Sequence, residues 1–358
     1  MNQKENLLRA WRRQGPERLP LAAGIPFLRW AEFGYDEGEI EDVCLRHPIL
    51  FPGYQKGTIE RNCIHGLNTR GEIRAGEKFV DPWGCGWFTL HDGFVGTVKD
   101  HPLADWAALE NFHAPDPEVT DGMYPLRWDA LQKTADHPER ENFFFGVGLP
   151  HGHTFLRVQD LRGYENFLFD MADEEPRIEK VLDIVTSFHE EVIRRFIALR
   201  PDMITIPEDL GMQNCPMISP ELFKKYISPC YERLIRPIKQ AGILVHEHSD
   251  GYILDLIDEL IRLGSDIINL QDLVNGIDSI QKYVKGRVSI DLDIDRQQIT
   301  VHGSPWDCKE HIRECVEKLG AKEGGLSLTY QPWPPTPIAN MDAIFGAMEE
   351  YGVINYPF

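Results

Sequence analysis

The segment LVHEHSDG, residues 244–251, begins as an apolar run and ends in side chains that can bind a metal or transfer a proton. His246, His248 and Asp250 stand at every second position, so they face the same side for as long as the chain is extended. Neighbours at this spacing can share one metal ion, and a bend at Gly251 would let all three do so. We therefore expect His248 and Asp250 to be catalytic residues and metal ligands, with His246 as a further candidate ligand. The alternative is that Asp250 caps the following helix and that His246 is a buried structural residue.

Paired acids, Glu208 and Asp209, end another predicted strand in the segment MITIPEDLGM. Such a pair can bind a metal, act as a general acid or base, or hold a substrate hydroxyl. We expect Glu208 to be catalytic and to help hold the metal. The alternative is that one of the two acids only caps the following turn.

Other polar side chains follow predicted strands elsewhere in the chain. Asp295 and Tyr330 are candidate catalytic proton donors, although Tyr330 can equally pack beneath the neighbouring Trp-Pro-Pro loop. His151 and His153 follow a further strand and can contribute a ligand, but two closely spaced histidines in a loop are weak evidence for a site.

These candidates depend on strands that alternate with helices along the chain. Several of the helices begin at a Ser-Pro or Thr-Pro pair and end at a glycine, which are common helix caps. Connections of only a few residues between strands and helices are typical of parallel βα units. The predicted strands span residues 19–25, 143–149, 203–212, 243–248, 266–271, 287–294 and 324–330.

The fold class follows from this alternation. A doubly wound sheet would normally carry a glycine-rich phosphate loop after its first strand, and neither G-x-G-x-x-G nor G-x-x-x-x-G-K occurs in the chain. We therefore predict an α/β protein, a single (β/α)8 TIM barrel domain spanning residues 1–358, with its site at the C-terminal ends of the strands. An N-terminal helix and a β-rich elaboration at residues 56–100 are expected over the barrel mouth.

Aromatic residues are concentrated in this elaboration, at Trp83, Trp87, Phe88 and Phe94. Large aromatic rings either contact a ligand or bury themselves in a core. They could therefore form a lid that lines a ligand, or pack a small sheet against the barrel, and both alternatives stay open.

Composition restricts the partners and the compartment. The chain carries 37 Lys and Arg against 57 Asp and Glu, a net charge of −20, which disfavours binding to nucleic acid. The seven cysteines are scattered without a C-x-x-C pair, so no disulfide framework or zinc knuckle is expected. The charged start does not resemble a secretory signal, and no apolar run of about 18 residues predicts a membrane span. We expect a cytoplasmic protein that binds neither nucleic acid nor membrane.

Several segments resemble the uroporphyrinogen decarboxylase superfamily, in order along nearly the whole chain. They are KENLLRAWRRQGPERLPL, TVKDHPLADWAAL, PEDLGMQNCPMISPELFKKYISPCYERLI, VHEHSDG and PPTPIANMDAI. The block SPELFKKYISPCYERL followed by HSDG is the more specific part. The resemblance implies a (β/α)8 barrel with one of two activities, decarboxylation of a tetrapyrrole or methyl transfer that depends on cobalamin or another corrinoid.

The resemblance to the decarboxylase itself is incomplete at its substrate-binding positions. Arg29 matches the first arginine of the decarboxylase motif, but Phe33 stands in place of the second, and LTYQPWP replaces a segment that carries a histidine. The thiol-directed methyltransferases bind zinc through a His-x-Cys pair and a later cysteine. The resemblance places His248 on that histidine, and Asp250 and Tyr330 on the two cysteines. Oxygen ligands in place of thiolates suit an oxygen substrate, a harder metal, or no metal.

The resemblance therefore implies a methyltransferase. The expected reaction moves a methyl group from a small methoxylated or methylated compound, such as an aryl methyl ether undergoing O-demethylation, to a corrinoid (cobalamin) carried by a partner protein. A divalent metal such as zinc could assist at His248, Asp250 and Glu208. The alternatives are a decarboxylase or lyase acting on a small carboxylated substrate, and a barrel that binds a ligand without catalysis. Formation of a homodimer stays open.

Overall fold

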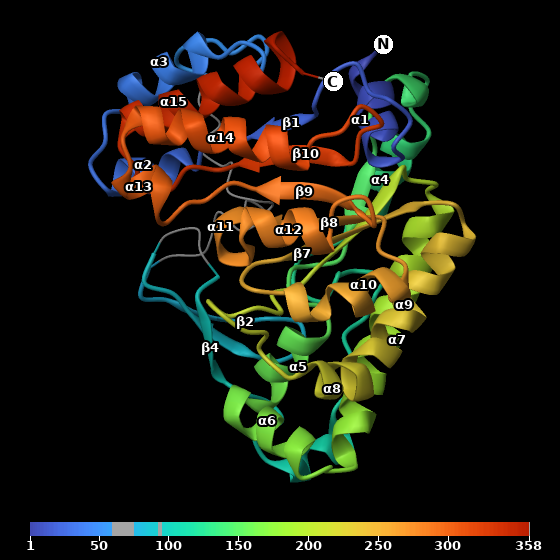
Figure 1. Ribbon diagram of the computed structural model, residues 1–358. Coiled ribbons are helices and arrows are strands. Elements are labelled where there is room, and N and C mark those ends of the chain that lie inside the picture. Colours follow the sequence, from blue (N-terminus) through green and yellow to red (C-terminus); the bar gives the residue numbers. More distant parts are fainter. Residues whose placement is uncertain (59–74, 92–94, 358) are drawn as a thin grey trace. The chain divides into compact units, whose positions relative to one another are not determined.

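The computed structural model describes residues 1–58, 75–91 and 95–357. The chain divides into two compact units, of which the first comprises Met1–Asn68 with Asn269–Phe358 and the second comprises Thr69–Ile268. Both units combine helices with parallel strands, so the predicted α/β class is confirmed (Figure 1). The prediction of a single domain over residues 1–358 stays a prediction.

The described part of the first unit contains three complete parallel strands. These are β1 (Leu21–Ala23), β9 (Ser289–Asp293) and β10 (Leu326–Tyr330), and they are followed in the strand order by β8 (Ile267–Gln271), which begins in the second unit and ends in the first. The order within the unit is β1-β10-β9-β8, and Leu328 of β10 pairs with Leu21 on one side and Leu292 on the other. Its helices are α1 (Gln3–Trp11), α2 (Phe27–Glu32), α3 (Glu37–Arg46), α11 (Asp272–Asn275), α12 (Ile277–Tyr283), α13 (Ile299–His302), α14 (Pro305–Leu319) and α15 (Ile338–Glu349), which continues into the π-helical segment η6 (Glu350–Ile354).

The second unit holds the strands whose ends carry most of the predicted site. They are β5 (Gly146–Gly148), β6 (Met203–Pro207) and β7 (Leu244–Ser249), which pair in parallel in the order β5-β6-β7. Its helical segments are η2 (Trp106–Asn111), α4 (Trp128–Ala135), η3 (Arg140–Asn142), α5 (Phe155–Arg162), α6 (Tyr164–Ala172), α7 (Arg177–Ala198), α8 (Pro220–Leu222), η4 (Phe223–Ile227), α9 (Ser228–Gln240), η5 (Leu254–Leu256) and α10 (Ile257–Leu263).

A separate antiparallel sheet also belongs to the second unit. Its strands are β2 (Lys78–Val80), β3 (Gly86–Phe88) and β4 (Thr97–Asp100), in the order β2-β3-β4. The predicted β-rich character of residues 56–100 is thus confirmed where the structure describes them. Trp83 is buried in a core with Phe188, whereas Phe94 lies outside the described residues.

Local signals set many of the element boundaries. Ser219 and Ser304 accept hydrogen bonds from Leu222 N and Asp307 N, as expected of N-caps before Pro220 and Pro305. Gly264 ends α10 in the left-handed region, with φ 117°. No helix among the described residues is long and apolar enough to span a membrane.

All seven strands predicted from the sequence occur in the parallel sheet. A (β/α)8 barrel requires an eighth parallel strand that closes the sheet, and the described residues provide seven. The structure therefore supports the α/β class and a parallel sheet of these seven strands.

Candidate functional site

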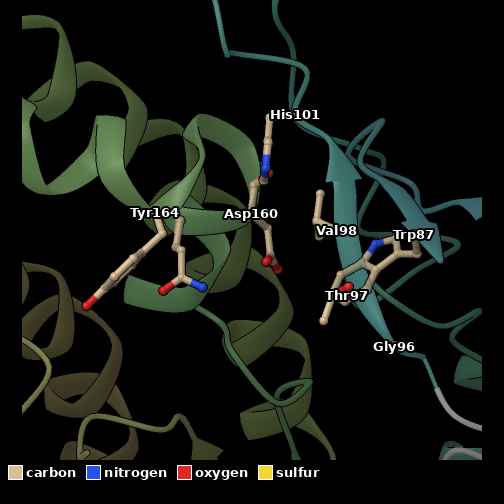
Figure 2. A pocket seen from close by; sticks show the side chains of 8 residues that line it. Trp87, Gly96, Thr97, Val98, His101, Asp160 and Tyr164 are labelled. Carbon is tan, nitrogen blue, oxygen red and sulfur yellow. The ribbon is translucent and has the colours of Figure 1, made fainter. Parts of the chain in front are cut away.

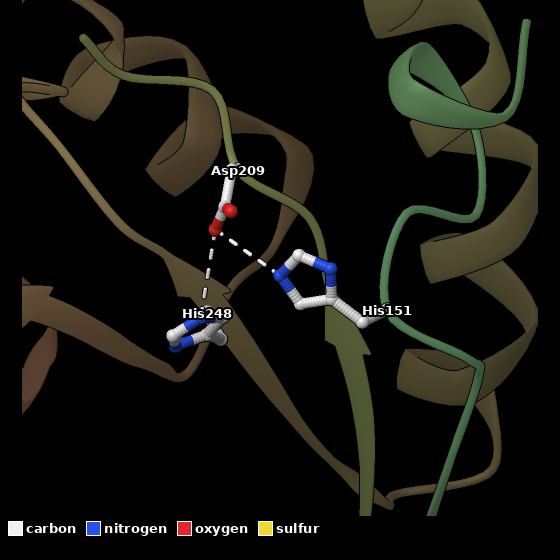
Figure 3. A group of neighbouring side chains, drawn as sticks. All are labelled: His151, Asp209 and His248. Atoms are coloured by element: carbon white, nitrogen blue, oxygen red, sulfur yellow. Dashed lines mark hydrogen bonds and ion pairs between the residues drawn. The ribbon is translucent and has the colours of Figure 1, made fainter. Parts of the chain in front are cut away.

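Three side chains able to bind a metal meet at the C-terminal ends of neighbouring strands in the second unit (Figure 3). His151 lies in the loop after β5, Asp209 follows β6 by two residues, and His248 is the penultimate residue of β7. The strands β5, β6 and β7 run parallel, so their carboxyl ends lie at one edge of the sheet. Residues nearly one hundred positions apart in the chain are brought together in this way.

The distances suit a shared cation. His151 Nε2 lies 3.1 Å from Asp209 Oδ1, and His248 Nε2 lies 3.6 Å from the same oxygen. One donor atom from each residue lies within 4.8 Å of the others. A divalent ion bound at about 2.0 to 2.2 Å needs donor atoms roughly 3 to 3.5 Å apart, so small side-chain movements would complete the site. The two imidazoles and one carboxylate fit zinc or another borderline divalent ion.

The candidate ligands remain partly open to solvent. The side chains of His151, Asp209 and His248 retain 49%, 32% and 24% of their accessible surface. Structural zinc sites are closed by four protein ligands, whereas catalytic sites keep a position for water or substrate. This exposure therefore matches a site that admits a substrate.

Backbone hydrogen bonds hold the ends of β6 and β7 together beside these ligands. Asp250 N donates to Asp209 Oδ1 at 3.0 Å, and Leu210 N donates to Ser249 Oγ at 2.9 Å. The first of these bonds fixes the direction of the Asp209 carboxylate. The orientation of the ligand is therefore set by the backbone of the segment that carries His248.

Gly251 makes this close approach possible. Its φ of +81° is in the left-handed region, and an added Cβ would lie 2.3 Å from the Gly211 backbone. Only glycine meets both requirements without strain. The bend anticipated at Gly251 is thus present, and it serves to bring the loops after β6 and β7 into contact.

Interactions within the cluster shift the pKa values of Asp209 and His151. Burial by itself would raise the pKa of the Asp209 carboxyl, but the hydrogen bond from His151 and the charges of His151 and His248 outweigh it and lower that pKa to about 2. Burial would lower the pKa of His151, but its bond to Asp209 and the carboxylates of Asp209, Glu208 and Asp250 raise it above its ordinary value. The metal-free cluster is therefore a hydrogen-bonded imidazole and carboxylate.

Glu208, the predicted acid of the pair, has a different environment. It is completely buried, and its Oε1 accepts hydrogen bonds from Thr154 N at 2.8 Å and Leu156 N at 3.0 Å. Its Oε2 accepts a hydrogen bond from Tyr231 OH at 2.8 Å. Glu208 thus caps the start of α5, where the Thr154 side chain makes no cap bond. Asp209, the other acid of this pair, is the one that the structure brings to His248.

The other acidic and imidazole side chains of residues 246–250 lie in different environments. His246 is buried on β7 and pairs in register with Thr205. Asp250 reaches the cluster through its backbone N–H and through the effect of its charge on His151. Glu247 lies between them, fully buried, and accepts a hydrogen bond from Ser265 Oγ. Burial raises the pKa of Glu247 well above its ordinary value.

Asp295 and Tyr330 belong to the first unit. Asp295 accepts hydrogen bonds from Gln298 N and Thr300 N, so it caps the short helix α13. Tyr330 is buried, with its ring packed edge-on against Phe345, and burial raises the pKa of its hydroxyl. Their predicted role as proton donors stays a prediction.

The sequence contains a signal for His151 and Asp209 as ligands. His151 follows a strand, as His248 does, and Asp209 belongs to an acid pair at a strand end. Neighbouring residues of an extended chain point to opposite sides, so one acid of such a pair faces away from a shared site. Only the positions of the neighbouring strands decide which acid that is.

Comparisons with known proteins agree with this fold. A family model described as uroporphyrinogen decarboxylase (URO-D) matches residues 88–351, more than half of the chain. A solved methyltransferase from Methanosarcina mazei has a TM-score of 0.64 and 16% sequence identity, over 98% of this chain and 99% of that chain. A B12-independent methionine synthase from Shewanella has a TM-score of 0.42 and 13% identity, over 63% of this chain and 65% of that chain. No curated protein sequence matches the chain significantly.

Proposed function

Because the chain belongs to the uroporphyrinogen decarboxylase family, we propose that it is an enzyme that transfers a methyl group to a corrinoid protein. The methyl donor is a small methoxylated or methylated compound. The proposal includes an eighth strand that closes the observed parallel sheet into the (β/α)8 barrel of the family. The observation that carries the proposal is the cluster of His151, Asp209 and His248 at the strand ends. The likeness to the Methanosarcina methyltransferase supports the same class of reaction.

The composition of the cluster favours an oxygen-containing donor. A divalent metal such as zinc, held by His151, Asp209 and His248, would act as a Lewis acid on the oxygen that loses its methyl group. None of the three ligands is a thiolate, which is the ligand type that suits activation of a substrate thiol. The Asp250 N–H holds the Asp209 carboxylate in place, so the two imidazoles face a fixed partner.

If no metal is bound, His151 and Asp209 can transfer a proton instead. His151 Nε2 shares a hydrogen bond with Asp209 Oδ1, and both side chains are partly exposed. An imidazole held by a carboxylate can deliver its proton to a departing oxygen. The fully buried Glu208 instead holds the first turn of α5 in position behind the site.

The experiment uses the purified protein with reduced cobalamin as the methyl acceptor. A panel of methoxyarenes and methylated amines is supplied, and formation of methylcobalamin is followed by its absorption spectrum. We expect turnover with at least one donor, and a loss of about 10²-fold or more in the variants Asp209→Asn and His248→Ala. The matched control His113→Ala changes an exposed histidine of the same unit and should retain full activity.

A decarboxylase or lyase is the second candidate, since the family model carries that name. Release of carbon dioxide from a small carboxylated compound, without dependence on cobalamin, would support this candidate and contradict methyl transfer. Absence of both reactions with the whole panel would favour a barrel that only binds a ligand.

A further inference from the structure

A cavity of about 280 Å³ lies in the second unit between the antiparallel sheet and α5 (Figure 2). Trp87, Thr97 and Val98 line it from the sheet, and Asp160 lines it from α5. Figure 2 shows the Asp160 carboxyl group projecting from the helix into the space before β4. Cavities for drug-sized ligands run from roughly 300 to 1,000 Å³, so this one suits a small compound.

The side chains that contact Asp160 and its partner Arg157 contain more carboxylate than guanidinium. Arg157 Nη1 lies 2.7 Å from Asp81 Oδ2 and 3.7 Å from Asp160 Oδ2, so one guanidinium faces two carboxylates. The shorter contact belongs to Asp81, which also accepts a hydrogen bond from Trp87 Nε1 at 2.9 Å. Arg157 and Asp81 are almost completely buried, whereas Asp160 keeps some exposure toward the cavity. The charge of Asp160 is therefore only partly compensated.

The pKa of the Asp160 carboxyl reflects this partial compensation of its charge. Burial raises the pKa of its carboxyl to about 7, Arg157 opposes the rise, and the charges of Asp81 and Glu208 add to it. Beside it, the Oε1 atom of Gln159 is buried and makes no hydrogen bond among the described residues. Gln159 and Asp160 both line the cavity; Gln159 Oε1 has no donor among the described residues, and the Arg157 guanidinium lies 3.7 Å from Asp160.

Two aromatic residues and one imidazole, that of His101, also line the cavity, and the described lining residues include no lysine or arginine. Trp87 and Tyr164 both line the cavity, and the Trp87 ring stacks on Phe79 with an interplanar angle of 4°. Aromatic faces attract ammonium groups, and they also accommodate methyl groups. Acceptors, excess negative charge and aromatic rings together favour a cation.

We propose that this cavity binds the protonated amino group of a small amine. Its role in selecting the methyl donor rests on the proposed function. The helix α5 connects the two places, because its first turn is held by Glu208, the neighbour of Asp209. The cavity is thus lined by the same helix, α5, whose first turn Glu208 holds. A cationic substituent bound in the cavity would orient the rest of the methyl donor.

The first test is calorimetric titration at pH 8 without any corrinoid. The probe is 2-(dimethylamino)ethanol, which is protonated at this pH, and its neutral isostere 3-methyl-1-butanol is the comparison. We expect the cation to bind at least tenfold more tightly than the alcohol. Equal affinities would overturn the proposal, because they would show that charge is not recognised.

The second test uses variants of the cavity. Asp160→Asn should weaken binding of the cation at least tenfold, and Tyr164→Leu should weaken it about three- to tenfold, as expected for loss of one cation–aromatic contact. Asp173→Asn changes an exposed acid of the same unit and should have no effect. Unchanged affinity in Asp160→Asn, with an unaltered circular dichroism spectrum, would overturn the proposal even if the other variants behave as expected.

The titration tests this inference, and the methyl-transfer assay tests the proposed function, so the two results can be told apart. Methyl transfer from neutral methoxyarenes with no binding of the amine would overturn this inference and leave the proposed function standing. Binding of the amine with no methylcobalamin from any donor would support the cavity assignment and contradict methyl transfer.

Discussion

Asp209 Oδ1 lies 3.6 Å from His248 Nε2, although the two residues are separated by 39 positions in the chain. The same oxygen accepts the Asp250 N–H, which belongs to the segment that carries His248. The segment that carries His248 therefore also orients the Asp209 carboxylate that pairs with the His248 imidazole. This coupling makes the cluster a single geometric unit rather than three independent side chains.

Metal binding is the first prediction from this cluster. Titration with Co²⁺ should produce visible absorption bands of nitrogen and oxygen ligation, without a thiolate charge-transfer band. Removal of any one ligand, in His151→Ala, Asp209→Ala or His248→Ala, should weaken binding of Co²⁺ by at least tenfold. His113→Ala is the control. A thiolate band, or equal affinity in all four variants, would place the metal elsewhere.

The cap of α5 gives a prediction about stability. Tyr231→Phe removes the hydroxyl that donates to Glu208, so the free energy of unfolding should fall by about 1.5 to 3 kcal/mol. Urea denaturation measures the change. Tyr283→Phe alters an exposed tyrosine and should stay within about 0.5 kcal/mol of the wild type. A Tyr231→Phe protein as stable as the control would mean that the Glu208 contacts are not maintained in solution.

Gly251 offers a test of the contact between two loops. Gly251→Ala should lower the free energy of unfolding by more than about 2 kcal/mol, because its φ is +81° and the new Cβ would meet the Gly211 backbone at 2.3 Å. Gly242→Ala is the matched control, since Gly242 has φ +73° but nothing within 4 Å of an added Cβ. That change should cost only about 1 kcal/mol. Equal losses would argue against the close approach of the loops.

Binding of the amine should depend on pH through Asp160. Its carboxyl has a pKa of about 7, in an environment charged by Arg157, Asp81, Glu208 and His151. The amine stays protonated below pH 8, so the ion pair forms only as the carboxyl loses its proton. Affinity should therefore rise about tenfold from pH 6 to pH 8. The Asp160→Asn protein should show a flat profile, and a rise in that variant would assign the titration to another group.

The same raised pKa predicts a gain in stability on substitution. In the unfolded chain the Asp160 carboxyl ionises near its ordinary pKa of 3.8, so the folded state holds an extra proton between that pH and about 7. Stability contributed by this residue then falls as pH rises through this window. Asp160→Asn should accordingly raise the free energy of unfolding by about 1 to 3 kcal/mol at pH 8, and by less at pH 5. Thermal unfolding at both pH values measures the difference, and a lower stability at pH 8 would contradict it.

Much of the fold could be predicted because strand and helix boundaries depend on short-range chemistry. The β-branched runs, the Ser-Pro starts and the terminating glycines act within a few residues of one another. The predicted strand at residues 143–149, for example, contains β5, and Ser304 caps α14 as its sequence indicates. Closure of the sheet is different, because it depends on pairing between distant segments.

For the site, the sequence by itself determined that His248 ends a strand among metal-capable residues, since alternation and a following glycine are local properties. Only the tertiary structure decided that Asp209 rather than Glu208 is its partner. Pro207 of β6 pairs with His248 of β7, and this register turns the next acid toward the α5 cap and the one after it toward the imidazole. A register between strands is set by packing over the whole sheet, so no pattern within either segment contains it.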